Sequence, residues 1–211
     1  GLYFRYKAAL FEPVRQLDVE QRRLELAQQN GRVVSALNAA KETLLHRLGS
    51  GRPGSKINHY LKLYFLAQDL HERVSSSHYP YQALAEAFFH SDVLFRCQRL
   101  LRLQASACAE LGEAIQLRQT FRYSDANAQA LEDLQASLEH LREQNNPAWR
   151  GLLRSLRALS SNLSTLQRQL ASASDPAALE GTQDSSLLDR QPQTLREAFN
   201  RIRLQLTPTS L

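Results

Sequence analysis

Leucine and other apolar residues recur along most of this chain at steps of three and four positions, the spacing of one face of a helix. The clearest run starts at Trp149 and continues through Leu152, Leu156, Leu159, Leu163, Leu166 and Leu170. Asn146 is a good N-cap, and Pro147 suits the first helical turn because its missing N–H costs nothing there. The pattern therefore predicts a helix that starts at Pro147 and buries this apolar seam.

Several other segments show helical periodicity. We expect a helical segment in residues 1–10, a long helix at about 14–48, and helices at about 57–75, at 80–119, and through Leu141, the last of which Ser124 and Asp125 can cap. The apolar phase of 14–48 continues past Gly31, which favours one long helix there, with a turn at 28–31 as the alternative. A bend near residues 90–92 is compatible with the pattern of the 80–119 helix. Thr194 to Glu197 form a capping box before a last amphipathic helix that runs through Leu206.

The connections between these segments indicate the fold class. Gly and Pro are scarce and lie at segment boundaries, above all in the loop 50–55, whereas good helix formers such as Leu, Ala, Gln, Glu and Arg dominate. No repeat with a period of 20–50 residues is visible, so a solenoid is not indicated. Long helices joined by short, capped turns predict an all-α fold, an elongated antiparallel helical bundle with long coiled-coil-like helices. We expect residues 1–211 to form a single domain.

The chain has no methionine, even at position 1, which we interpret as a sign that it is a piece of a longer protein. Its apolar runs, such as Leu63 to Ala67, fall far short of the roughly 20 residues of a membrane-spanning helix. Cys97 and Cys108 fall on one predicted helix, where the helical rise separates them by roughly 16 Å. They are therefore too far apart for a disulfide, and we expect reduced thiols, consistent with a cytosolic setting.

No recognisable pattern of catalytic chemistry occurs, and we expect no enzyme activity, no cofactor and no metal. The histidines lack the spacing of zinc ligands, and neither a phosphate-binding loop nor a nucleophile elbow is present. We interpret several polar residues near the turn between 57–75 and 80–119 as a structural polar cluster. This candidate structural polar cluster consists of His71, Glu72, His78, Tyr79, Asp92 and Arg96. Within it, Asp92 and Arg96 form a charge ladder on a helix surface.

The net charge of +5 invites an acidic partner. Arg150, Arg154 and Arg157 share the face opposite the apolar seam, but no aromatic residues accompany them there, so we interpret that face as solvated and expect no nucleic acid. Basic and aromatic residues together are typical of segments next to a membrane, which predicts such segments at 1–12 and 194–211 and an anionic membrane surface as partner. The candidate membrane-proximal residues are Tyr3, Phe4, Arg5, Tyr6, Lys7, Arg201 and Arg203.

Five long strings carry a resemblance that covers nearly the whole chain. They are residues 11–17 (FEPVRQL), 62–73 (KLYFLAQDLHER), 75–81 (SSSHYPY), 87–99 (AFFHSDVLFRCQR) and 146–154 (NPAWRGLLR). With these strings the chain resembles the YccS/YhfK family of bacterial inner-membrane proteins, a family similar to fusaric-acid-resistance and aromatic-acid-exporter proteins. The resemblance implies the soluble region between two bundles of transmembrane helices of an efflux transporter, with residues 206–211 leading into the second bundle. It carries over no transport residues.

Two functions follow. The first is an accessory domain that scaffolds or regulates the membrane bundles. Its partners would be the transmembrane helices of the same polypeptide, with self-association as a further option. The basic ends favour the cytoplasmic side for it, because Lys and Arg near membrane-spanning ends mark that side. The alternative is a free-standing binding module, with the arginine faces for nucleic acid or a groove for an apolar ligand. The residues expected around that groove are Tyr60, Tyr64, Phe88 and Trp149.

Overall fold

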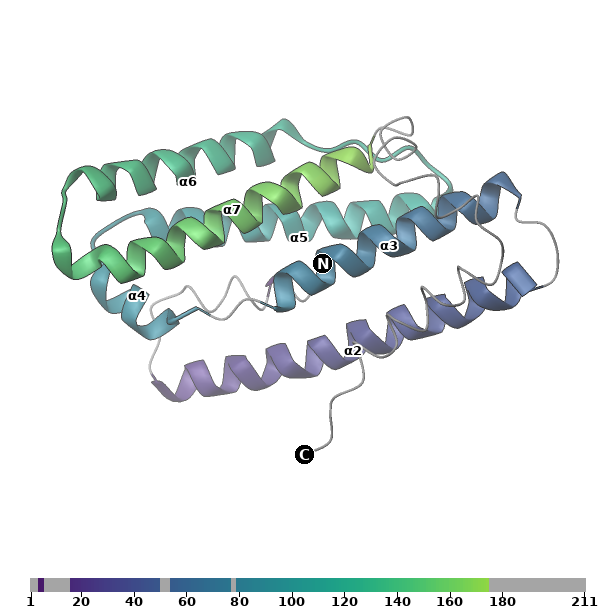
Figure 1. The fold of residues 1–211 in the computed structure, drawn as a ribbon, viewed down its shortest axis with the longest axis horizontal. Coiled ribbons are helices and arrows are strands. Elements are labelled where there is room, and N and C mark those ends of the chain that lie inside the picture. Colours follow the sequence, from purple (N-terminus) through teal and green to yellow (C-terminus); the bar gives the residue numbers. More distant parts are fainter. Residues whose placement is uncertain (1–3, 6–15, 50–53, 77–78, 175–211) are drawn as a thin grey trace.

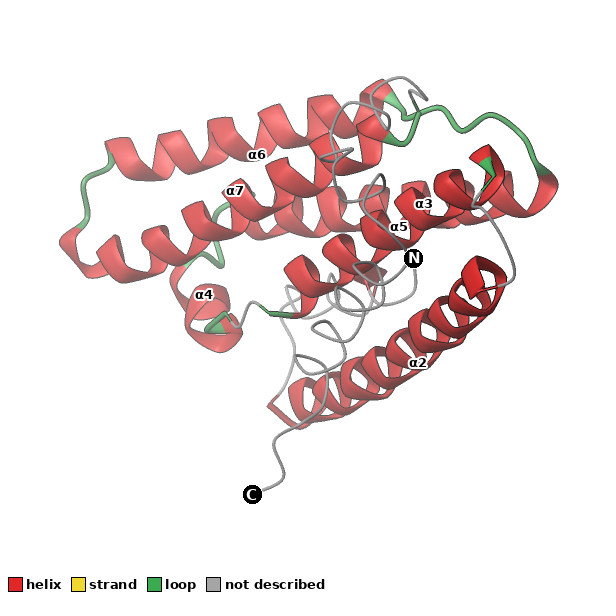
Figure 2. Cartoon of the chain, turned by 45° about the vertical axis from the view of Figure 1, so that its right-hand side comes forward, coloured by secondary structure: helices red, strands yellow, loops and turns green. Residues whose placement is uncertain are grey.

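The computed structural model describes residues 4–5, 16–49, 54–76 and 79–174. Within these ranges the chain forms six α-helices and one 3₁₀ turn, with no strand, so the all-α prediction is confirmed (Figures 1 and 2). The elements are α2 (Gln16–Gly49), α3 (Ser55–Ser75), α4 (Tyr81–Ala87), α5 (Val93–Leu117), α6 (Asp125–Glu143), η1 (Pro147–Trp149) and α7 (Arg150–Ser172).

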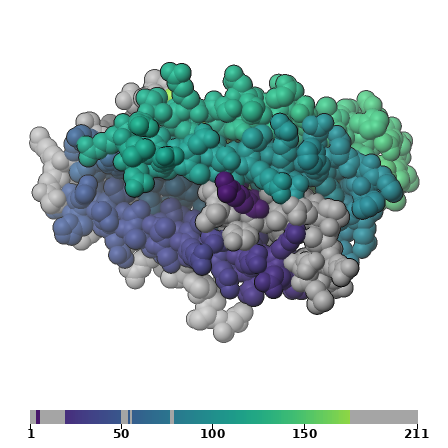
Figure 3. Space-filling model, turned by 180° about the vertical axis from the view of Figure 1, so that it is seen from behind, coloured from purple at the N-terminus to yellow at the C-terminus, as the bar shows by residue number. Residues whose placement is uncertain are grey.

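Consecutive long helices run in opposite directions and form a bundle (Figure 1). Helix α7 lies at its centre and contacts α3, α5 and α6, while α5 and α6 pack against each other along their lengths. Helix α2 lies outside this group and packs on α3, so it forms the lower edge of the molecule when seen from behind (Figure 3). The antiparallel bundle is therefore confirmed, whereas supercoiling of the helices stays a prediction.

Helix α2 is one continuous helix of 34 residues, and Gly31 lies within it. The preference for one long helix over a turn at 28–31 is thus confirmed for residues 16–49; its expected start at residue 14 lies outside the described residues. Towards its end, α2 packs Leu37, Leu44, Leu45 and Leu48 on Leu61 and Tyr64 of α3, which form a second, smaller core cluster.

The expected helix at 80–119 is two helices, which corrects the prediction of a single bent one. Helix α4 ends at Ala87, and Phe88 leaves the helix with φ −115° and ψ 21° while its side chain stays buried. Helix α5 then starts at Val93, whose backbone N–H donates to Ser91 Oγ at 3.2 Å. A hydroxyl that accepts from the first turn of a helix competes with continuation of the preceding one, so the chain breaks here rather than bends.

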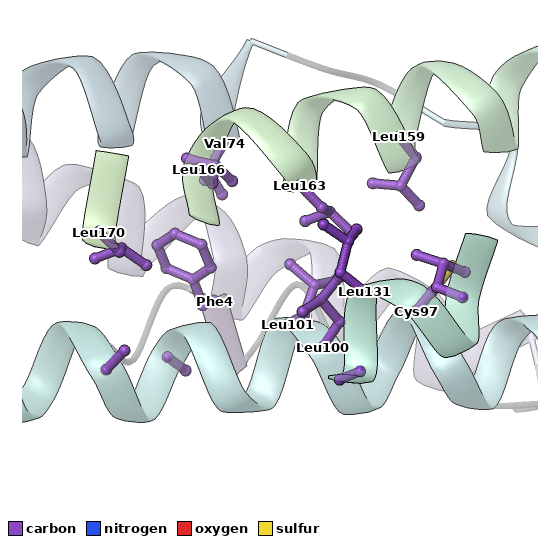
Figure 4. Packing of buried hydrophobic residues seen from close by; sticks show 14 of the residues in the cluster. Phe4, Val74, Cys97, Leu100, Leu101, Leu131, Leu159, Leu163, Leu166 and Leu170 are labelled. Atoms are coloured by element: carbon purple, nitrogen blue, oxygen red, sulfur yellow. The ribbon is translucent and has the colours of Figure 1, made fainter. Parts of the chain in front are cut away.

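The leucine seam of α7 forms the centre of the main core. Leu156, Leu159, Leu163, Leu166 and Leu170 are each no more than 1% exposed. They meet apolar residues of α5 and α6, such as Leu100, Leu101 and Leu131, in the space between the helices (Figure 4). Trp149 is half-buried and lies at one end of the seam, where its ring centroid is 5.3 Å from that of Phe88. The predicted buried face of this helix is confirmed.

Two helix starts agree with the sequence signals. Asn146 Oδ1 accepts a hydrogen bond from the backbone N–H of Ala148 at 3.0 Å, and Pro147 begins the 3₁₀ turn that leads into α7. Ser124 Oγ accepts from the backbone N–H of Ala126 at 3.3 Å at the start of α6. In both places a side-chain oxygen satisfies an N–H that has no partner within the helix.

Candidate functional site

The residues expected as one polar cluster lie in two different places. Asp92 and Arg96 belong to a link between α5 and α6: Ser137 Oγ donates to Asp92 Oδ1 at 2.5 Å, and Arg96 Nη1 donates to Asp133 Oδ2 at 3.2 Å. Arg96 Nε also donates to Asp92 Oδ2 at 3.1 Å, one turn away on the same helix. The expected ladder on the helix surface is thus joined to a neighbouring helix.

This link changes the acidity of Asp92. The hydrogen bond from Ser137 is the main cause that lowers the pKa of the Asp92 carboxyl, and the hydrogen bond and positive charge of Arg96 lower it further against the effect of partial burial. The carboxylate is therefore the stabilised form. Its role in the described structure is to join two helices, which agrees with a structural interpretation.

The other members of the expected cluster lie near the end of α3. Glu72 and Tyr79 line a pocket between α3 and α7, with a cavity volume of about 710 Å³. His71 is half-buried, and burial lowers its pKa, which favours neutral imidazole. His78 lies outside the described residues.

The pocket is built from matching faces of two helices. Helix α3 and its C-cap residue contribute four positions at the spacing i, i+3, i+4, i+7, namely Asp69, Glu72 and Arg73 of the helix and Ser76 directly after it. Helix α7 contributes four positions at the same spacing, namely Ala158, Ser161, Asn162 and Thr165. Asn162 Nδ2 donates to the backbone oxygen of Arg73 at 3.0 Å, which holds the two faces together. The small side chains of α7 leave the space that the pocket occupies.

Charged groups dominate the α3 side of the pocket. Burial is the largest cause that raises the pKa of the Asp69 carboxyl, the neighbouring charge of Glu72 raises it further, and Arg73 opposes both. The Nε atom of Arg73 is buried without a hydrogen-bond partner in the described structure. Unsatisfied buried donors are uncommon in proteins, and a bound water, ion or ligand is one explanation for such a group. This pocket is the candidate functional site.

A second pocket of about 350 Å³ lies at the opposite end of α3, where α5 and α7 end. Its walls include Tyr60, Leu63 and Phe121, together with Arg118, which ends α5 in the left-handed region at φ 56°. Of the four aromatic residues expected around one apolar groove, only Tyr60 lines it. Tyr64 belongs to the α2–α3 cluster, and Phe88 packs with Trp149 in the main core, so the four do not form one groove.

The cysteines and histidines offer no further site in the described ranges. Cys97 and Cys108 both lie on α5 as free thiols, as expected from the sequence, and burial raises the pKa of Cys97 to about 12. A thiol with so high a pKa carries little thiolate, the reactive form, at neutral pH. No group of three or more His, Cys, Asp or Glu residues that could hold a metal ion occurs among the described residues.

Of the candidate membrane-proximal residues, the structure describes two. Phe4 is 5% exposed and lies among the core leucines near Leu166 and Leu170 (Figure 4), so its ring serves the core rather than a bilayer. Arg5 is exposed. The other five lie outside the described residues: Tyr3, Tyr6, Lys7, Arg201 and Arg203. Arg150, Arg154 and Arg157 are exposed on α7, as the interpretation of a solvated face requires.

Sequence reasoning singled out Glu72 and Tyr79 but missed Asp69, Arg73 and Asn162. The available signal was a second periodicity, a stripe of mostly polar residues at i, i+3, i+4, i+7 along α3 with its C-cap and along α7. A polar stripe ordinarily means a face in water, and only the pairing of the two helices turns it into a pocket.

In the described part of the chain, no helix has the length and apolar character needed to cross a membrane.

Comparison with known proteins gives a consistent result. A family model described as FUSC-like inner membrane protein yccS matches residues 1–170. The inner membrane protein YccS of Escherichia coli K12 is 36% identical over 211 residues, which cover 99% of this chain and 29% of that protein. An uncharacterized protein of Haemophilus influenzae is 30% identical over 175 residues, or 81% of this chain and 24% of that protein. The chain thus spans less than a third of either relative, and no solved structure matches it.

Proposed function

The chain belongs to the FUSC-like family of inner membrane proteins, and we propose that it is the cytoplasmic domain of an efflux transporter in the bacterial inner membrane. In this proposal it scaffolds or regulates two bundles of transmembrane helices of the same polypeptide and catalyses no reaction. One observation carries the proposal: almost the whole chain aligns with 29% of an inner membrane protein. The proposal assigns the membrane-spanning bundles to the part of such a protein that this chain does not cover.

The packing of the described helices supports the role of a distinct domain. The seam of α7 is covered by α5, α6 and α3, and the arginines on its opposite face are exposed. A bundle that buries an apolar core between its own helices is stabilised by the hydrophobic effect in water. Such a unit can hold a fixed shape beside the membrane and so orient the segments joined to its ends.

The charge at both ends supports the cytoplasmic side. Arg5 and Lys7 lie near one end, and Arg196, Arg201 and Arg203 lie near the other. An excess of basic residues within about 15–20 residues of a membrane-spanning segment marks its cytoplasmic end. The same residues are placed to contact anionic headgroups, each contributing on the order of 1 kcal/mol at most.

Cysteine labelling of the full-length parent protein in its native membrane tests on which side of the membrane this domain lies. Ala136 is exposed on α6, so a cysteine introduced by Ala136→Cys will react with a membrane-impermeant maleimide wherever the reagent has access. We expect labelling in inverted inner-membrane vesicles and none in intact spheroplasts, because the proposal orients this domain towards the cytoplasm.

The unsubstituted protein is the control, which measures the background labelling of all native cysteines of the parent protein, including the buried Cys97 and the partly buried Cys108 of this chain. Labelling of the Ala136→Cys protein in intact spheroplasts would place the domain on the periplasmic side and overturn the proposal. Equal labelling of a soluble fraction that lacks membranes would instead support a free-standing module.

A further inference from the structure

The pocket between α3 and α7 carries charges of both signs. Asp69, Glu72 and Arg73 line it, and the described structure contains no ion pair for any of the three. Asp69 and Glu72 are exposed, whereas the Nε atom of Arg73 is buried without a hydrogen-bond partner. A buried donor without a partner is unfavourable, and the exposed carboxylates are open to a ligand, so this set has unused capacity for binding.

A second Asp–Arg pair in the same chain shows that this arrangement is not dictated by spacing. Asp92 and Arg96 are four residues apart on a helix and form an ion pair, with Arg96 Nε 3.1 Å from Asp92 Oδ2. Asp69 and Arg73 have the same spacing on α3 and line the pocket, but they form no ion pair in the described structure. Both charged groups therefore lie beside the open volume of the pocket without a hydrogen bond to each other.

The rest of the pocket is suited to a small polar molecule. Its volume of about 710 Å³ lies within the range of roughly 300–1,000 Å³ found for small-molecule sites. Ser161, Asn162 and Thr165 of α7 supply neutral hydrogen-bonding groups opposite the charged wall. Asp69 and Glu72 repel each other, and a positive group between them would relieve that repulsion.

We propose that this pocket binds a small zwitterion, with the ammonium group held by Asp69 and Glu72 and the carboxylate held by the guanidinium of Arg73. This inference goes beyond the proposed transporter role and does not depend on which side of the membrane the domain occupies. Arginine is well suited to a carboxylate because its guanidinium can donate two parallel hydrogen bonds. Two carboxylates disfavour a plain anion, and Arg73 disfavours a plain cation.

Three four-carbon probes separate the options, because they differ only in their charged ends. The 211-residue chain, labelled with ¹⁵N, is titrated at neutral pH with 4-aminobutanoate, butylamine or butanoate, and the amide signals of residues around the pocket are followed. We expect saturable shifts with 4-aminobutanoate and at least roughly tenfold weaker binding of the other two, since each of them loses one charge-assisted contact.

Matched variants test which residues bind each charged end of the ligand. Arg73→Gln should weaken the binding of 4-aminobutanoate roughly tenfold and should not weaken the binding of butylamine. Asp69→Asn or Glu72→Gln should instead weaken the binding of both compounds alike. The controls Arg154→Gln and Glu132→Gln make the same charge changes on exposed positions outside the pocket and should change nothing. Unchanged dispersion of the amide spectrum verifies that each variant is folded.

Three outcomes overturn the proposal. Butylamine binding as tightly as 4-aminobutanoate, with no effect of Arg73→Gln, would make the pocket a plain cation site. Butanoate binding as tightly as 4-aminobutanoate would make it an anion site. The absence of saturable shifts with 4-aminobutanoate in the folded chain would show that the pocket does not bind a zwitterion of this size. None of these outcomes bears on the cysteine labelling of the parent protein, so the two proposals fail separately.

Discussion

Leu166 illustrates how single residues stabilise this molecule. It is fully buried at the centre of the α7 seam, where it contacts side chains from neighbouring helices. Arg154 lies on the same helix but is exposed. Truncation of a buried leucine removes apolar contacts and leaves a cavity, whereas truncation of an exposed arginine does neither.

We predict that Leu166→Ala lowers the free energy of unfolding by about 2–5 kcal/mol. The matched variant Arg154→Ala should change it by less than about 0.5 kcal/mol. Urea denaturation followed by circular dichroism measures both. Equal, small losses would mean that the seam does not form the core of the folded chain.

Asp92 shows how the helices are joined at the scale of elements. The α4–α5 break brings Asp92 to the start of α5, where it accepts from Ser137 of α6 while Arg96 reaches Asp133. These contacts join the beginning of α5 to the middle of α6 in addition to their apolar packing. A partly buried link of this kind is a modest contribution that depends on pH.

The lowered pKa of Asp92 gives the sign of that dependence. Its stabilisation is present above the ordinary carboxyl pKa, near 3.8, and is lost as the pH falls through the lower pKa of the folded state. We predict that Asp92→Asn destabilises the chain at pH 7 by on the order of 1 kcal/mol and that the difference from the unsubstituted chain shrinks as the pH falls from about 5 to 2.

Urea denaturation at a series of pH values measures this difference. Glu132→Gln, which neutralises an exposed carboxylate on α6, is the control and should show little change at any pH. A destabilisation by Asp92→Asn that stays constant down to pH 2 would mean that the carboxylate form does not contribute through its charge.

The distribution of charge concerns the molecule as a whole. The net charge is +5, with basic residues near both ends and four exposed arginines along α7. Because attraction to an anionic surface falls off within a Debye length of about 8–10 Å at physiological salt, only the basic residues nearest the bilayer contribute. The proposed function assigns that position to the ends of the chain.

We therefore predict weak binding of the chain to anionic liposomes at low salt. Neutralising Arg5, Lys7, Arg201 and Arg203 together should abolish it, because each contributes at most about 1 kcal/mol. Neutralising Arg150, Arg154 and Arg157 should leave it nearly unchanged. Liposome co-sedimentation measures the binding, and a DNA gel shift run in parallel tests the alternative. Tight DNA binding that depends on the α7 arginines, without lipid binding, would contradict the prediction.

The sequence by itself determined most of the described helices, the buried face of α7 and two of the helix starts, but it did not separate α4 from α5. These features are local, since the spacing of leucines defines a helix face and a capping side chain bonds to N–H groups two or three residues away. Asn146 and Ser124 were identified for this reason, and so was the continuity of α2 through Gly31. The family was recognisable from long strings of residues.

Only the tertiary structure decided which polar faces meet. Arg73 and Asn162 are 89 positions apart, and the pocket exists because α3 and α7 turn matching, mostly polar stripes towards each other. The burial of Phe4 likewise depends on residues far away in the sequence, and so does the contact of Phe88 with Trp149. Periodicity identifies the face of a helix that avoids water, but several pairings of helices bury the same leucines. The pairing, and with it the candidate site, follows from how the side chains of all the helices fit together.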